Sequence, residues 1–139
     1  MKKILVTFLV FFSFFAFSQS KNVQKNKIDQ KLVGTWKGSE TDQQVEGMTK
    51  YWVLSRFADG TFSMMFTTSQ NCEINSHVET GQWWIQNGEY HELHYISGNT
   101  DVYTYSFPTE NTVKYKVLDS KIVGETYEFT DTKVTDNSL

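Results

Sequence analysis

Short runs of alternating apolar and polar residues fill most of the chain, and brief turns separate these runs. From Val33 onward the alternation has a period of two residues, which is typical of β-strands that bury one face. Between the runs stand Asp59-Gly60, Asn87-Gly88 and Gly98-Asn99, dipeptides of the kinds found in tight hairpin turns. The pattern predicts eight strands, at Val33–Glu40, Met48–Phe57, Thr61–Thr68, His77–Gln86, Glu89–Ser97, Thr100–Phe107, Thr112–Leu118 and Ile122–Lys133.

Strands of this kind must close or stack their sheet, because the sheet has to bury one face and hide its edges. Eight is also about the number of strands at which a closed barrel encloses one small ligand. We therefore predict an all-β fold, an eight-stranded antiparallel up-and-down barrel formed as a single domain by residues 32–139. The third connection, Ser69–Ser76, is the longest and most polar, and we expect a mobile loop there, at the open end.

The N-terminal residues have the features of an export signal. Lys2 and Lys3 precede the apolar run Ile4–Phe17, and Ala16-Phe17-Ser18 offers small residues at the two positions that a signal peptidase recognises. The run is shorter than the ~20 residues that span a bilayer. We predict a signal peptide at residues 1–18, export to the periplasm or outside the cell, and no membrane span after cleavage. Residues 19–31 are predicted to form a polar tether, with a short helical turn near Ile28–Leu32 that caps the barrel.

Charge and motifs exclude several classes of function. The chain has 13 Lys and Arg residues against 16 Asp and Glu residues, and cleavage also removes two of the lysines. An acidic balance argues against a nucleic-acid partner. Cys72 is the only cysteine, so an internal disulfide is impossible, and we expect it to be a passive loop or strand-end residue. No cofactor is predicted, since no phosphate-binding glycine loop or nucleophile motif occurs.

The segment Leu32–Gly38 contains the residue that we expect to anchor the fold. Gly34 leaves room for a bend where the chain enters the sheet, and Trp36 supplies a large, stiff apolar side chain with one N–H group to satisfy. We predict that Trp36 plugs the closed end of the barrel.

Two stretches of the chain resemble the lipocalin-like domain family of small exported bacterial proteins. They are the entry sequence Gly34-Thr35-Trp36 and the predicted hairpin Gly81–Glu92, and the resemblance extends over residues 31–134. It implies a lipocalin- or calycin-like barrel. Lipocalins usually stack an arginine of the last strand over the entry tryptophan, whereas the only arginine here is Arg56. The resemblance therefore leaves Lys133 to cover Trp36, without the planar group of arginine.

Tight turns fix which side chains share a face of the sheet. With Asp59-Gly60 as a two-residue loop, Phe57 pairs with Phe62, and the inward face is the one that carries Tyr51 and Val53. The outward face then carries Trp52, Leu54 and Arg56. Farther along the chain, Asn87-Gly88 pairs Trp83 with Glu92 and Ile85 with Tyr90, and Gly98-Asn99 pairs His94 with Tyr103. Trp84 faces outward in this arrangement, which the sequence does not explain.

The inward face of the later strands gathers aromatic rings around a carboxyl group and an imidazole. Glu92 and His94 lie two residues apart on one strand, so both point into the interior. An aromatic wall with a few convergent polar groups is the usual make-up of a small-molecule site. We predict that the barrel binds a small hydrophobic or amphipathic molecule, with the ligand-binding residues Trp83, Tyr90, Glu92, His94, Tyr103, Tyr105, Tyr115 and Tyr127.

Three alternatives stay open from the sequence. The same residues can hydrogen-bond one another and fill a solid core. Glu92 and His94 can instead act as an acid–base pair of an enzyme. Outward-facing Trp52, Met65 and Trp84 can form a contact patch for a protein partner. No metal site is predicted, because a spacing of three residues places His91 and His94 on opposite faces of a strand. The oligomeric state is left undetermined.

Overall fold

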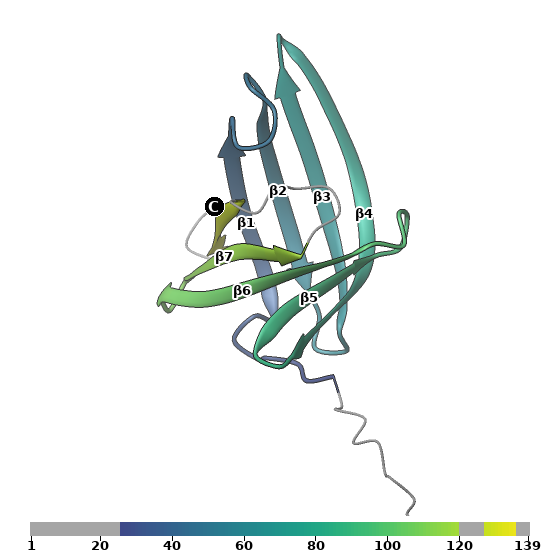
Figure 1. Cartoon of the computed structure of the whole chain (residues 1–139), viewed down its shortest axis with the longest axis vertical. Coiled ribbons are helices and arrows are strands. Elements are labelled where there is room, and N and C mark those ends of the chain that lie inside the picture. Colours follow the sequence, from purple (N-terminus) through teal and green to yellow (C-terminus); the bar gives the residue numbers. More distant parts are fainter. Residues whose placement is uncertain (1–25, 120–126, 136–139) are drawn as a thin grey trace, which may run out of the picture.

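The computed structural model describes residues 26–119 and 127–135. Within these ranges the chain forms a closed antiparallel barrel whose strand order follows the chain (Figure 1). The predicted fold class is therefore confirmed. The strands are β1 (Gly34–Thr41), β2 (Thr49–Arg56), β3 (Thr61–Gln70), β4 (Glu73–Gln86), β5 (Glu89–His94), β6 (Thr100–Thr109), β7 (Thr112–Asp119) and β8 (Glu128–Lys133). The predicted signal peptide, residues 1–18, and most of the predicted tether lie outside the described residues.

The β3–β4 hairpin reaches well beyond β5 and β6 (Figure 1). The predicted loop at Ser69–Ser76 is wrong, because β3 continues to Gln70 and β4 begins at Glu73. Asn71 and Cys72 form the turn between them, and both have positive φ angles, 50° and 65°. These are the angles of the two-residue turns that fit the twist of a hairpin. The sequence did not reveal this part of β4, because both faces of the hairpin tip are exposed over Glu73–Val78. A strand that is exposed on both faces carries polar residues like those of a loop.

The turn between β2 and β3 has three residues, Ala58–Gly60, rather than two. The Phe57 N–H donates to the Thr61 carbonyl at 2.9 Å, and Gly60 takes a φ of 86° that favours glycine. The additional residue pairs Arg56 with Phe62 instead of Phe57 with Phe62. A shift of one residue exchanges the two faces of a strand. The predicted orientation of β2 is therefore wrong: Trp52, Leu54 and Arg56 are buried, whereas Tyr51 and Val53 are exposed.

The predicted register is correct for the β4–β5 hairpin and wrong for the β5–β6 hairpin. Across Asn87-Gly88, Trp83 pairs with Glu92 and Ile85 with Tyr90, as predicted. The pairing across Gly98-Asn99 is different from the prediction, because β5 already ends at His94. Tyr90 therefore pairs with Tyr103, and Glu92 with Asp101. The register differs by an even number of residues, so the predicted inward face is retained.

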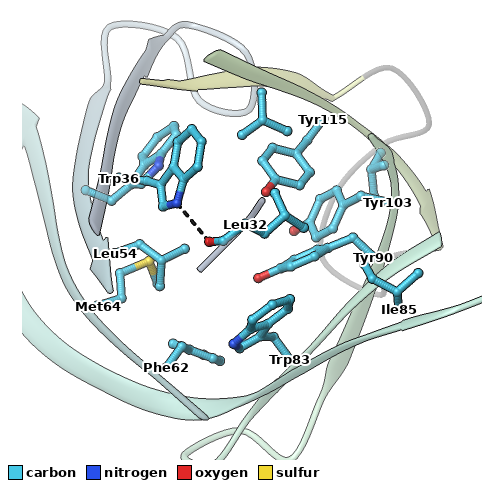
Figure 2. Packing of buried hydrophobic residues seen from close by; sticks show 13 residues of the cluster. Leu32, Trp36, Leu54, Phe62, Met64, Trp83, Ile85, Tyr90, Tyr103 and Tyr115 are labelled. Carbon is cyan, nitrogen blue, oxygen red and sulfur yellow. Dashed lines mark hydrogen bonds between the residues drawn. The ribbon is translucent and has the colours of Figure 1, made fainter. Parts of the chain in front are cut away.

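One end of the barrel is closed by a packed core around Trp36 (Figure 2). Trp36 and Leu32 are both 0% exposed, and the Trp36 indole N–H donates to the Leu32 carbonyl at 2.9 Å. The Lys133 Nζ lies 5.4 Å from the centre of the Trp36 ring. The chain before β1 also belongs to this end, since Lys27 pairs with Ile85 and the Leu32 N–H donates to the Asp29 carbonyl at 3.0 Å. The predicted plug, its lysine cover and the capping turn are confirmed.

The outward-facing Trp84 has an explanation in the structure. Its ring stacks on His91, with centroids 5.3 Å apart and an interplanar angle of 9°, and its N–H donates to Gln86 Oε1 at 3.3 Å. The predicted contact patch is wrong in its composition, because Trp52 lies inside the barrel.

We expect Trp36→Ala to lower the free energy of unfolding by about 3–5 kcal/mol, the usual cost of truncating a fully buried large aromatic side chain. Chemical denaturation followed by circular dichroism measures this change. Lys133→Ala is the matched variant, and its effect should be much smaller because the side chain covers the ring only from one side. A denaturation midpoint for Trp36→Ala close to that of the parent would show that Trp36 is peripheral to the core.

Candidate functional site

A cavity of about 300 Å³ occupies the half of the barrel that the Trp36 core leaves unfilled. It lies toward the end where the β1–β2 connection contributes Gln44. One part of its wall is apolar, and another part carries charged groups. The apolar and aromatic part consists of Trp52, Leu54, Met64, Phe66, Tyr103, Tyr127 and Phe129. The charged and titratable part consists of Lys50, Arg56, His77, Glu79, Glu92, His94 and Asp101.

Strand β2 contributes most to this wall, because its alternate residues all point inward. Lys50, Trp52, Leu54 and Arg56 are buried at every second position, as a half-buried strand requires. The neighbouring strand makes room for the Trp52 ring by carrying Gly38 opposite it. A Cβ atom at Gly38 would lie 2.5 Å from this ring, so only glycine fits there.

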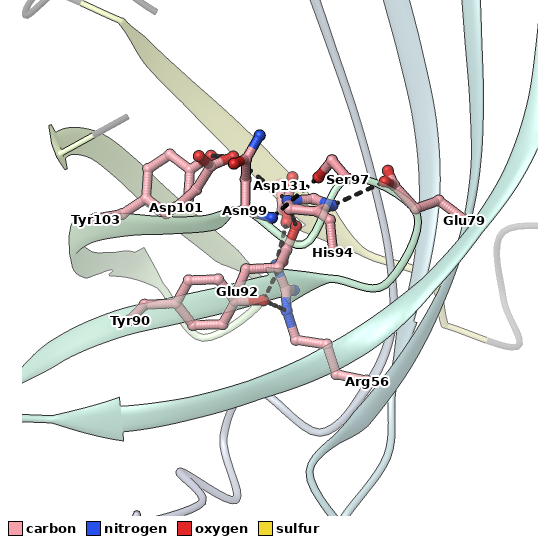
Figure 3. A network of polar contacts seen from close by, with 10 residues as sticks. All are labelled: Arg56, Glu79, Tyr90, Glu92, His94, Ser97, Asn99, Asp101, Tyr103 and Asp131. Atoms are coloured by element: carbon pink, nitrogen blue, oxygen red, sulfur yellow. Dashed lines mark hydrogen bonds and ion pairs between the residues drawn. The ribbon is translucent and has the colours of Figure 1, made fainter. Parts of the chain in front are cut away.

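Arg56 lines the cavity, and its guanidinium also lies 5.0 Å from the centre of the Tyr90 ring in the packed core. Figure 3 shows the polar network around Arg56. Its Nη2 is 3.1 Å from Asp131 Oδ2, and its Nε donates to the Tyr90 hydroxyl at 2.9 Å. Asp131 also accepts the indole N–H of Trp52 at 2.7 Å. The Tyr90 hydroxyl in turn donates to Glu92 Oε2. These partners offset the cost of burying a guanidinium that is only 2% exposed.

The protonation states of this network follow from burial and from the neighbouring charges. Burial alone lowers the pKa of Arg56, but the surrounding tyrosines, Asp131 and Glu92 raise it well above its ordinary value, so Arg56 stays charged. Burial raises the pKa of Glu92, against the opposing effects of Arg56 and His94. Burial also raises the pKa of Tyr90, which therefore remains a hydrogen-bond donor at neutral pH.

His94 lies among three carboxylates (Figure 3). Its Nδ1 is 3.1 Å from Glu79 Oε1, and its Nε2 is 3.3 Å from Asp101 Oδ2 and 3.5 Å from Glu92 Oε1. Burial lowers the pKa of His94, but the bond to Asp101 and the charges of the carboxylates outweigh burial and raise this pKa to about 9. His94 is therefore an imidazolium ion at neutral pH. We call His94, Glu79, Glu92 and Asp101 the acidic cluster.

A second ion pair lies at the same end of the barrel. Lys50 Nζ is 2.8 Å from Glu40 Oε1, and both side chains are buried. Lys50 Nζ also lies 5.4 Å from the centre of the Tyr127 ring. Its charge is thus compensated within the protein.

The structure separates the predicted site residues into two groups. Four of them line the cavity: Glu92, His94, Tyr103 and Tyr127. The other four do not line it. Trp83, Tyr90 and Tyr115 are buried in the packed core, and the Tyr105 hydroxyl donates to Asp29 Oδ2 at 3.0 Å. The part that any of these residues plays in ligand binding stays a prediction.

Sequence reasoning did not identify several residues of the cavity and its network. Arg56 and Trp52 were placed outside by the register error in β2. Asp131 was a detectable case, because it follows the inward-facing Phe129 by two residues and so shares its face. Asp101 was detectable in the same way, because it precedes the inward-facing Tyr103 by two residues, and the corrected register pairs it with Glu92.

The described ranges contain no group of three or more His, Cys, Asp or Glu side chains arranged to hold a metal ion. His91 and His94 do face opposite sides, since His91 stacks on the outward Trp84 and His94 lines the cavity. Among the same residues, none forms a helix with the length and apolarity needed to cross a membrane.

The charge of His94 predicts a dependence on pH. Its folded-state pKa of about 9 lies above the ordinary value of 6.5. Its contribution to stability is therefore complete below pH 6.5 and is lost as the pH rises toward about 9. An NMR titration of the imidazole measures this pKa directly. Glu79→Gln should move the pKa toward 6.5, because it removes one of the three carboxylates. A parent protein whose His94 titrates near 6.5 would contradict the described cluster.

Asp131→Asn should lower the free energy of unfolding by about 3–5 kcal/mol, because a buried guanidinium then loses its counter-charge. Equilibrium denaturation measures the change. Glu128→Gln is the matched control, since it breaks the exposed pair in which Lys114 Nζ and Glu128 Oε2 are 2.7 Å apart. Solvent screens that pair, so its loss should change stability little. Equal effects of the two variants would show that the Arg56–Asp131 pair has no special role.

Comparison with known proteins agrees with this architecture. The family model of the lipocalin-like domain matches residues 32–115, a segment that extends from the residue accepting the Trp36 N–H bond into β7. A comparison with curated proteins finds no match. The family match covers more than half of the chain and includes most of the residues that line the cavity. We conclude that the chain belongs to the lipocalin-like domain family.

Proposed function

We propose that this protein binds a small hydrophobic or amphipathic molecule inside its barrel and that it does so as an exported protein. The observation that carries the proposal is the cavity of about 300 Å³, with an aromatic wall on one part and a few convergent polar groups on another. Small-molecule sites in proteins have this make-up and begin at about this size.

The aromatic wall supports binding because its rings hold one another in place. Trp52 stacks with Phe66 at a centroid distance of 6.5 Å and meets Phe129 edge-on at 5.3 Å. Tyr103 meets Phe129 edge-on at 5.4 Å. A wall that is already ordered loses little conformational freedom when a ligand enters, so more of the contact energy remains for affinity.

The polar part of the cavity gives the bound molecule an orientation. The Tyr90 hydroxyl joins Arg56 to Glu92 by hydrogen bonds, and Glu92 in turn forms an ion pair with His94, so these polar groups are held in place. A ligand with one polar end therefore gains by placing that end near these groups and its apolar body against Trp52 and Phe129. The chain's features of an export signal, residues 1–18, support a place of action outside the cytoplasm.

Met64→Trp tests the proposal, because Met64 lines the cavity and the larger indole would fill part of it. N-Phenylnaphthylamine, a neutral fluorescent probe, should bind the parent saturably, with a rise in its own emission. We expect Met64→Trp to weaken this binding at least about tenfold, which corresponds to about 1.4 kcal/mol.

Met65→Trp is the matched control, since the neighbouring Met65 points outward and is 53% exposed. It should leave probe binding unchanged, and thermal denaturation should show that both variants remain folded. If Met64→Trp binds the probe as tightly as Met65→Trp and the parent do, the cavity is not the binding site and the proposal is refuted.

A further inference from the structure

We propose that the ligand is a small amine, whose ammonium group binds beside the acidic cluster while a nearby hydroxyl or carbonyl oxygen accepts a hydrogen bond from Arg56. This inference rests on the proposed binding function and specifies the chemistry of the polar end. It separates an amine ligand from a carboxylate ligand such as a fatty acid.

The charge balance of the cavity is the first argument. The positive charge of Arg56 is compensated by Asp131, and that of Lys50 by Glu40. The remaining charged groups are three carboxylates around the single imidazolium of His94. With Glu92 protonated, two carboxylates still face one cation. The cluster therefore has an excess of negative charge at neutral pH, which favours a further cation and opposes a further anion.

The second argument is the position of aromatic rings beside these carboxylates. The Tyr103 hydroxyl donates to Asp101 Oδ2 at 3.3 Å, so one residue joins the aromatic wall to the acidic cluster. Cations are attracted to the faces of aromatic rings, most strongly where water is excluded. Lys50 already makes such a contact with Tyr127 at this cavity. Rings together with carboxylates form a suitable environment for an organic ammonium group.

The third argument is an unsatisfied donor on Arg56. Within the part of the chain that the structure describes, Arg56 Nη1 is buried and has no hydrogen-bond partner. The Arg56 side chain is 1% exposed, lines the cavity and lies beside Glu92 (Figure 3). A buried donor without a partner costs stability, so an oxygen atom of a ligand fits this place.

A ligand carboxylate would also accept a hydrogen bond from Arg56 Nη1, but the surrounding negative charge would repel it. The charge of Arg56 is already neutralised by Asp131, and Glu92 lies on the same side, joined to Arg56 through the Tyr90 hydroxyl. A neutral oxygen gains the hydrogen bond without the repulsion. A ligand with both an ammonium group and a neutral acceptor oxygen therefore fits both polar parts of the cavity, the acidic cluster and the free donor of Arg56.

Isothermal titration calorimetry at pH 7 with four probes that share a phenyl body tests the inference. Phenylalaninol carries an ammonium group and a hydroxyl, phenethylamine only the ammonium group, hydrocinnamyl alcohol only the hydroxyl, and hydrocinnamate a carboxylate. We expect phenylalaninol to bind most tightly and hydrocinnamate least tightly, with about a tenfold difference or more between them.

Two substitutions locate the ammonium group. Glu79→Gln and Asp101→Asn should each weaken phenylalaninol binding about tenfold and leave hydrocinnamyl alcohol binding nearly unchanged. Unchanged alcohol binding also shows that the variant cavity is intact. Glu110→Gln is the matched control, because it removes one carboxylate from the exposed turn between β6 and β7, and it should change neither affinity.

The outcomes separate this inference from the proposed function. Equal binding of all four probes, or tighter binding of hydrocinnamate, overturns the amine inference while the cavity remains a ligand site. Loss of alcohol and amine binding to the same extent in Glu79→Gln and Asp101→Asn also overturns it, because the carboxylates then only maintain the cavity. If the neutral probe N-phenylnaphthylamine and all four phenyl compounds fail to bind, the binding function itself is refuted.

Discussion

The buried guanidinium of Arg56 is the constraint on which the interior of this barrel depends. A charge that is almost fully removed from water needs partners on several sides, and Arg56 has them on different strands. Asp131 comes from β8 and Tyr90 from β5, while Arg56 itself ends β2. The network thus joins strands that are distant in the barrel order. It holds β8 against the rest of the sheet at a place where β1 and β8 share only three paired positions.

The same network divides the interior into two halves with different chemistry. On one side, Trp36, Trp83 and Tyr115 pack into a core that leaves almost no exposed surface. On the other side lie the acidic cluster and the aromatic wall around open space. Arg56 touches both halves, since its guanidinium lies 5.0 Å from the centre of the Tyr90 ring and also lines the cavity. The filled half stabilises the barrel, and the unfilled half is therefore free to carry groups that do not improve packing.

The fold was predictable from the sequence because alternation and turn residues act locally. The β2 register was not, since Asp59-Gly60 suits both a two-residue and a three-residue loop, and one residue decides which face of β2 is buried. The register predicted across Gly98-Asn99 was wrong by more residues, but by an even number. The prediction of which side chains of β5 and β6 face inward was therefore unaffected. Glu92 and His94 were found from their spacing on one strand. Arg56 was missed because the β2 register error placed it on the outward face, and its partner Asp131 is 75 positions away in sequence, where no local pattern links the two.

The distribution of charge argues that the open half of the barrel serves more than stability. Apolar side chains of similar volume often stabilise a protein as well as a buried ion pair does, so stability alone does not explain a concentration of charged groups. Of the described charged side chains that are buried, Lys50, Arg56 and Glu92 line the cavity, and Glu40 and Asp131 pair with two of them. The core cluster is aromatic and aliphatic. His94 acts as the resident cation that keeps three nearby carboxylates from repelling one another. Because one imidazolium compensates them only in part, the cavity retains a negative field at the point where its aromatic wall begins. Under the proposed binding function, that field favours ligands with a positive charge.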